Sequence, residues 1–159
     1  MKSQYSECWS YSGLELSDSS PWGLKGVFTT LSLSGENPQL LFWEDHWERL
    51  ENSLTMLGFV QGLDNIVFVR NKALEFIENQ RCNYQHLLRI ALTEEAFSLD
   101  IRSIGTNIVT HGLEGHPIPF TRNDPSLKSL LDEEIYGQLK NVKRNEVELL
   151  LISPAGNIL

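Results

Sequence analysis

The chain has 159 residues, of which 41% are hydrophobic, and this is long enough for a globular domain with a core of its own. Its 21 acidic and 13 basic residues give a formal net charge of −8, which disfavours a nucleic-acid-binding protein because phosphates require a basic surface. The amino terminus has no apolar run that resembles the core of a signal peptide, and the apolar run at 149–152 is too short to span a membrane. The two cysteines, Cys8 and Cys82, indicate no disulfide framework, so we expect a cytoplasmic protein.

The first predicted elements are two β-strands that follow a long connection. Residues 10–25 are rich in Ser, Gly and Pro and are predicted to form that connection. Residues 26–35 and 38–43 suit two strands around a turn at 34–38. In the first strand the alternation separates two faces. The more apolar set, expected to face the core, is Val27, Thr29, Leu31 and Leu33. The opposite set, expected to form a pocket wall or a partly wet surface, is Phe28, Thr30 and Ser32.

Two helices are predicted next. Apolar residues at steps of three and four predict a helix near 43–58, and Gly58 is a plausible stop. The stripe expected to face a sheet consists of Trp43, Trp47, Leu50, Leu54 and Leu57. A second helix is predicted near 64–80. Its expected buried residues are Ile66, Val69, Leu74 and Ile77.

Two further strands complete the first predicted domain. They cover 86–95 and 96–104, and Phe97, Leu99 and Ile101 alternate along the second. Strands and helices in this order predict an α+β domain over residues 1–112. We expect an antiparallel sheet with the two helices packed on one side.

The remaining residues are predicted to begin a second domain. Residues 112–125 hold three of the six prolines and two of the eleven glycines, which indicates an interdomain linker, placed at 113–126. A helix near 126–142 and a strand from about 147, running into a turn at 153–156, follow. One helix and one strand cannot bury a core, so 127–159 is interpreted as the incomplete start of a C-terminal domain.

Most candidate functional residues have a simpler structural explanation when taken singly. His46 and Arg49 share one face of a predicted helix, where a solvated polar face is the usual case. Lys128 opens a predicted helix, where an exposed lysine is ordinary. Arg89 lies in an apolar strand and needs a partner or water. The two histidines after residue 110 have no second cluster of ligands, so no metal site is expected.

The order of these residues resembles that of the class IV aminotransferases. That family includes branched-chain and D-amino-acid aminotransferases and 4-amino-4-deoxychorismate lyase. Its opening motif is matched by Leu14, Asp18, Gly23, Gly26, Phe28 and Thr30. Its H-x-x-R-L helix is similar to His46, Arg49 and Leu50. Arg89 matches an arginine that the family carries in a strand, and Lys128-Ser129 matches its K-S/T pair after the linker. Residues 145–158 match a later acidic and apolar segment.

The resemblance implies an enzyme that uses pyridoxal 5'-phosphate and has the first domain of the D-amino-acid aminotransferase-like fold. It implies that Lys128 binds the cofactor covalently and moves protons at the substrate carbon. It also implies that Arg49 binds the cofactor phosphate, with His46 supporting the end of the helix. The substrate, an amino acid or aminodeoxychorismate, would contact Phe28, Thr29, Thr30 and Arg89. A homodimer is implied as well.

Three features depart from the family pattern. The turn at 23–26 carries one more residue than usual, and Leu131-Asp132 replaces the family's Asn-Tyr. The family's Glu that pairs with the pyridine nitrogen, and its phosphate-binding Thr and Ser residues, come after the segment that ends at Leu159. We therefore expect the isolated chain to bind the cofactor weakly or not at all, and its apolar strand near 149–152 to promote self-association.

The reaction stays open between several alternatives. Thr29 stands where the aminotransferases usually carry Glu, and the lyases often read F-T-T here, which favours a lyase that forms pyruvate and 4-aminobenzoate. The loss of one negative charge would also ease the approach of a substrate with two carboxylates. The first alternative is a branched-chain or D-amino-acid aminotransferase. The others are a truncated, non-catalytic relative that acts as a binding domain, and a small α+β binding domain with accidental motif matches.

Overall fold

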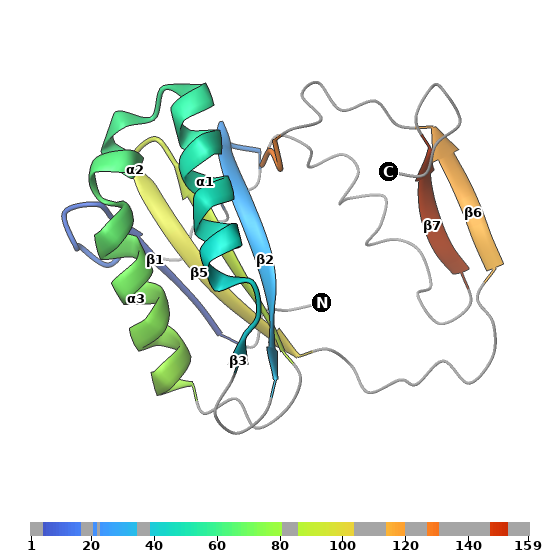
Figure 1. Ribbon diagram of the computed structural model, residues 1–159, viewed down its shortest axis with the longest axis horizontal. Coiled ribbons are helices and arrows are strands. Elements are labelled where there is room, and N and C mark those ends of the chain that lie inside the picture. Colours follow the sequence, from blue (N-terminus) through green and yellow to red (C-terminus); the bar gives the residue numbers. More distant parts are fainter. Residues whose placement is uncertain are drawn as a thin grey trace. The chain divides into compact units, whose positions relative to one another are not determined.

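A computed structural model describes the chain in eight parts, which are residues 5–16, 21, 23–34, 39–80, 86–103, 114–119, 127–130 and 147–152. The chain divides into two compact units. The first holds the described residues up to 103 together with 127–130, and the second holds the rest (Figure 1). Residues 127–130, which the sequence placed in a second domain, thus belong to the first unit.

The first unit is built on a five-stranded sheet of order β1-β5-β4-β2-β3. The strands are β1 (Tyr5–Ser10), β2 (Gly26–Ser34), β3 (Gln39–Leu40), β4 (His86–Thr93) and β5 (Ala96–Ser103). Every neighbouring pair in this order is antiparallel. Three helices, α1 (Trp43–Leu57), α2 (Val60–Asp64) and α3 (Ile66–Asn79), cover one face of the sheet (Figure 1). The predicted α+β fold is therefore confirmed.

The alternation predicted for β2 matches the burial of its side chains. Val27, Thr29, Leu31 and Leu33 are all buried, and three of them belong to the core under the helices. On the opposite face Phe28 is buried, Thr30 is half-buried and Ser32 is exposed. Because antiparallel partners share a face, the core set continues into Leu88, Ile90 and Leu92 of β4 and then into Phe97, Leu99 and Ile101 of β5.

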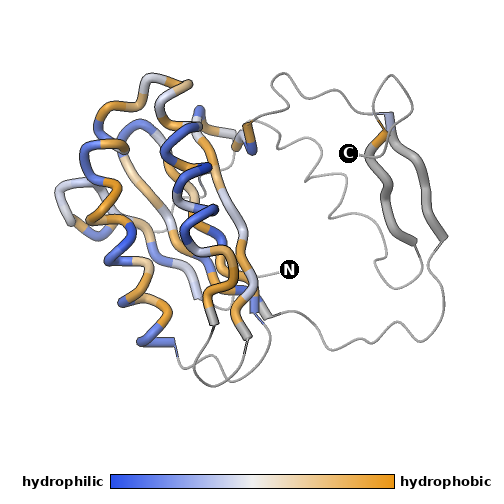
Figure 2. Tube along the Cα trace, viewed as in Figure 1, coloured by the Kyte–Doolittle hydropathy of each residue, from blue (hydrophilic) through white to orange (hydrophobic). Residues whose placement is uncertain are grey.

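Helix α1 presents the predicted stripe to the sheet. Trp47, Leu50 and Leu54 are buried, while Trp43 and Leu57 pack partly buried against the same core. Gly58 ends the helix with a φ of 71°, a left-handed conformation that glycine adopts without strain. Figure 2 shows hydrophilic and hydrophobic segments alternating along α1, as expected for a helix with one buried face.

The second predicted helix corresponds to α3, and the short α2 before it was not predicted. The buried face of α3 consists of Val69, Ala73, Phe76 and Ile77. Leu74, expected in the core, is only partly buried because helical spacing places it to one side of that face. No helix in the described part of the chain is long and apolar enough to cross a membrane.

Strands β1 and β3 differ from the sequence-based prediction. β1 lies where the sequence suggested no element, and it pairs with β5 across Cys8↔Ser98 and Trp9↔Phe97. The rings of Trp9 and Phe97 stack at 5.6 Å, so pairing with a distant strand stabilises this segment. β3 is shorter than predicted because Phe42 turns the chain with a φ of 57° and α1 begins directly after it.

The second unit contains β6 (Glu114–Pro119) parallel to β7 (Val147–Ile152). The β7 strand was predicted. β6 lies inside the range that was predicted to be a linker because of its prolines. The strand can form there because prolines are tolerated in strands at a sheet edge. The turns predicted around 35–38 and 153–156, and Cys82, lie outside the described residues.

Candidate functional site

Lys128 is attached to the edge of β2 by backbone hydrogen bonds. The amide of Phe28 donates to the Lys128 carbonyl at 3.0 Å, and the amide of Leu130 donates to the Gly26 carbonyl at 3.0 Å. Ser129 forms a β-bridge with Val27. The helix predicted at 126–142 is therefore wrong at its start, because these backbone groups pair with β2 instead of with their own segment. Residues 131–142 lie outside the described part.

Gly26 allows the segment around Lys128 to approach β2 closely. A Cβ at this position would collide with the Leu92 carbonyl oxygen and would lie 2.7 Å from Leu130 Cδ1. Leu127 and Leu130 are both buried. The segment is therefore fixed at two levels, by the backbone bridge and by its flanking leucines.

The Lys128 side chain lies near an aromatic ring and interacts electrostatically with His46 of α1. Its Nζ is 5.9 Å from the centre of the Phe28 ring. The pKa of His46 is lowered by burial first, then by the positive charges of Arg49 and Lys128, and Asp45 opposes them. Lys128, which is far from α1 in the sequence, therefore shares an electrostatic environment with His46 and Arg49.

His46 and Thr29 are joined by a hydrogen bond between α1 and β2. The distance between His46 Nδ1 and Thr29 Oγ1 is 2.6 Å. Thr29 is 0% exposed, whereas His46 is half-buried. Thr29, predicted to bind substrate, therefore lies on the helix side of β2 and contacts His46 there.

Arg49 lies three residues further along α1 and is exposed. Its carbonyl oxygen accepts a hydrogen bond from Ser53 Oγ at 2.8 Å, within the helix. The guanidinium can therefore be reached from solvent, as an anion-binding group must be.

Arg89 and Thr30 lie on the sheet face that carries Phe28. The register pairs Thr30 with Arg89, and Arg89 with Asp100. Arg89 Nε donates to Asp100 Oδ2 at 2.9 Å, and Nη2 donates to the same oxygen. Both residues are buried, with 6% and 3% of their surfaces exposed.

Asp100 is the residue that the sequence analysis missed. Arg89 was expected to need a partner, and the cross-strand register supplies it. A sequence signal existed, because Asp100 is a charged residue at one of the positions that alternate with Phe97, Leu99 and Ile101 and therefore face away from the helices. The pairing itself depends on how β4 and β5 are aligned, which the sequence pattern does not state.

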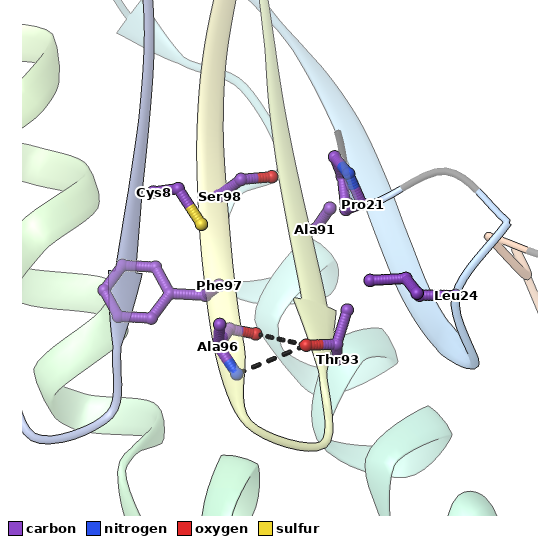
Figure 3. A pocket seen from close by; sticks show the side chains of 8 residues that line it. All are labelled: Cys8, Pro21, Leu24, Ala91, Thr93, Ala96, Phe97 and Ser98. Atoms are coloured by element: carbon purple, nitrogen blue, oxygen red, sulfur yellow. Dashed lines mark hydrogen bonds between the residues drawn. The ribbon is translucent and has the colours of Figure 1, made fainter. Parts of the chain in front are cut away.

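A small pocket lies on the same face of the sheet and is separate from these residues (Figure 3). It is lined by Cys8, Pro21, Leu24, Ala91, Thr93, Ala96, Phe97 and Ser98. Its volume of about 20 Å³ accommodates roughly one water molecule. The hydroxyl of Ser98 is buried and has no hydrogen-bond partner among the described residues. The pocket is too small for a cofactor or a substrate.

The structure therefore brings Lys128, His46, Arg49, Thr29 and Phe28 together at one end of β2. Thr30 is two residues after Phe28 on β2 and faces the same way. Arg89 is its partner on β4. The arrangement offers a primary amine, an exposed guanidinium and an imidazole whose pKa is lowered by burial and by neighbouring cations. Such a set can bind an anion and hold a nucleophilic amine beside it.

No protein-family model and no curated protein matches this sequence. Solved structures match over most of the chain. A hypothetical aminotransferase from Mycobacterium tuberculosis, in its PLP-bound form, has a TM-score of 0.63 at 14% identity, covering 96% of this chain and 63% of its own. The branched-chain aminotransferase of Thermoproteus uzoniensis, with norvaline, has a TM-score of 0.61 at 15% identity, with coverages of 96% and 61%.

The 4-amino-4-deoxychorismate lyase of Pseudomonas aeruginosa also matches, with a TM-score of 0.56 at 17% identity. The match covers 96% of this chain and 63% of the lyase. These likenesses show that the chain has the fold of the N-terminal portion of fold-IV aminotransferases and lyases, as the sequence resemblance implied. The chain spans 63% of the length of the Mycobacterium tuberculosis protein and 63% of the length of the Pseudomonas aeruginosa lyase.

Proposed function

We propose that this chain is part of a pyridoxal-phosphate-dependent enzyme of the fold-IV type. The observation that carries the proposal is Lys128, which two backbone hydrogen bonds anchor beside Phe28 and within the charge environment of His46 and Arg49. A lysine held in this way is suited to covalent attachment of an aldehyde. The neighbours named above support the cofactor, since one of them is a PLP-bound form.

The residues present fit this cofactor. Pyridoxal phosphate, when bound, supplies an aldehyde for attachment and a ring that accepts electrons from the reacting carbon. Lys128 would hold the aldehyde carbon through Nζ and move the proton at the substrate carbon. The exposed Arg49 fork would bind the phosphate, because a planar guanidinium matches two phosphate oxygens. His46 would support this end of α1 as an uncharged group.

The substrate would meet the face of β2 and β4 that carries Phe28, Thr30 and Arg89. Phe28 offers an apolar wall and Thr30 a hydroxyl. Arg89 offers a guanidinium whose direction is set by Asp100. This combination suits a small molecule that carries an amino group and at least one carboxylate. Thr29 lies on the other face, so its influence on the substrate would pass through His46.

For the reaction we propose lyase activity on aminodeoxychorismate, with release of pyruvate and 4-aminobenzoate. The Phe28-Thr29-Thr30 segment supports the lyase, and one of the structural neighbours is named as such a lyase. The alternative is transfer of the amino group of a branched-chain or D-amino acid to a 2-oxo acid, in line with the branched-chain aminotransferase neighbour. We also propose a homodimer. A truncated relative that binds a partner without catalysis remains the rival from another class.

Covalent labelling tests the proposed cofactor. After incubation of the full-length enzyme with saturating pyridoxal phosphate and reduction with borohydride, peptide mapping is expected to find the label on Lys128. Lys128→Ala should remove it, and Arg49→Ala should lower the phosphate-dependent retention while leaving the label position unchanged. Lys25→Ala is the matched control, because Lys25 also lies over a phenylalanine ring, at 5.2 Å from that of Phe59, but is exposed. A label distributed equally between Lys25 and Lys128 would refute the proposal.

Product analysis separates the two reactions. The full-length enzyme, purified with pyridoxal phosphate, should release pyruvate from aminodeoxychorismate faster than it transfers amino groups from leucine or D-alanine to 2-oxoglutarate. The reverse ranking would favour the aminotransferase. Labelling at Lys128 without either reaction would favour the non-catalytic relative.

A further inference from the structure

The hydrogen bond between Thr29 and His46 has a direction that burial decides. Thr29 is 0% exposed, so its hydroxyl proton needs an acceptor inside the protein. In the described part of the chain the recorded side-chain partner of this hydroxyl is His46 Nδ1, at 2.6 Å. If Nδ1 carried the proton and donated it to Oγ1, the hydroxyl proton would be left without that acceptor. Leaving a buried donor unsatisfied is unfavourable.

We propose that Thr29 is a positioning residue, which donates its hydroxyl proton to Nδ1 and thereby holds His46 in the Nε2–H form with a fixed ring orientation. A neutral imidazole has one donor and one acceptor nitrogen, and the hydrogen bond of one nitrogen decides the role of the other. The Thr29 hydroxyl occupies the acceptor. Nε2 is therefore the donor that His46 retains for the site.

The surrounding charges act in the same direction. An imidazolium ring would carry a proton on Nδ1 and would force the buried Thr29 hydroxyl to become an acceptor. The positive charges of Arg49 on α1 and Lys128 on the segment beside β2 also disfavour a charged ring, while Asp45 on α1 favours it. His46 thus lies among these groups as an oriented, uncharged donor and does not form a third cation.

Through this hydrogen bond, a residue on the core face of β2 can act on groups at the site. Thr29 touches no groove on the Phe28 side, since alternate residues of a strand face opposite ways. Its influence passes through one hydrogen bond to His46, and from His46 to whatever group Arg49 binds. The effect on cofactor binding rests on the proposed function, whereas the hydrogen bond and the ring form do not.

Nitrogen NMR of the cofactor-free, full 159-residue chain tests the proposal. The chain has four histidines, so His46→Gln assigns the His46 resonances in a histidine-labelled sample. At neutral pH we expect Nε2 to carry the proton and Nδ1 to resonate upfield of a free ring nitrogen, because it accepts a hydrogen bond. Thr29→Val should move Nδ1 downfield, and Thr29→Ser should restore its position. Thr30→Val, a matched change on the opposite face, should leave it unmoved.

Two outcomes would overturn the proposal. One is a proton on Nδ1 in the unaltered protein, which needs no variant and holds even if Thr29→Val does not fold. The other is an Nδ1 resonance that is the same in Thr29→Val as in the unaltered protein. In the full-length enzyme with pyridoxal phosphate present, Thr29→Val should also lower cofactor retention while the borohydride label stays on Lys128. Absence of any label in the unaltered full-length enzyme would refute the proposed function and leave the NMR result intact.

Discussion

Replacing Asp100 with Asn should lower the free energy of unfolding by about 3–5 kcal/mol, because Arg89 would stay buried after losing its counter-charge. The side chains of Arg89 and Asp100 are only 7% and 5% exposed, so water screens their interaction poorly. Asn keeps the size of Asp and one acceptor oxygen. The loss of stability in Asp100→Asn therefore comes mainly from the missing charge, and we expect it at the lower end of the range, about 3 kcal/mol.

A second Arg–carboxylate pair in the same unit provides the matched control. Arg70 donates to both carboxylate oxygens of Glu44, but these side chains are 35% and 75% exposed. Water and salt screen such a pair, so Glu44→Gln should cost no more than about 1 kcal/mol. The comparison isolates burial, since both pairs have the same chemistry.

Urea unfolding at neutral pH, followed by tryptophan fluorescence, measures both variants, and Trp47 in the core reports on packing. The double variant Arg89→Met with Asp100→Leu should recover most of the loss, because no buried charge remains. The reasoning fails if Asp100→Asn and Glu44→Gln lose the same small amount. It also fails if the double variant is less stable than Asp100→Asn.

Three further predictions follow from the site and the core. The pKa of folded His46 lies below its ordinary value of 6.5, so unfolding free energy should fall as the pH drops from 6.5 through that lower pKa. His46→Gln should flatten this part of the urea-unfolding pH profile, and an unchanged profile would contradict the assignment. Gly26→Ala should cost about 1–3 kcal/mol because the added Cβ collides with the Leu92 carbonyl oxygen and with Leu130, and borohydride labelling of Lys128 in the full-length enzyme should decrease; equal labelling would contradict the clash. Leu54→Ala should cost about 2–5 kcal/mol in urea unfolding, and a loss below 1 kcal/mol would mean that the cavity collapses.

Local periodicity was sufficient for most elements of the first unit. The stripe through Trp47, Leu50 and Leu54 is a property of one segment, and its spacing predicts both the helix and the face it buries. The same holds for the alternation in β2 and β5. Burial of alternate side chains follows from strand geometry once one face is covered. The α+β class and the inward faces were therefore predictable.

Pairings between distant segments were not predictable from such patterns. β1 is stabilised by β5, about 90 residues later in the chain, and its own sequence resembles a polar loop. Ser129 pairs with Val27, which converts the predicted start of a helix into a β-bridge. A strand at an edge takes its hydrogen bonds from whichever segment lies beside it, and the sequence alone does not name that segment.

The sequence by itself determined the candidate site residues, since its motif order predicts Lys128, Arg49, His46 and Arg89 without any knowledge of their contacts. The tertiary structure decided their partners. Register placed Asp100 opposite Arg89, and the packing of α1 on β2 placed His46 over Thr29. Residue type limits the chemistry that a side chain can perform. Its direction and its charge state depend on neighbours that only the assembled sheet and helices bring within hydrogen-bonding distance.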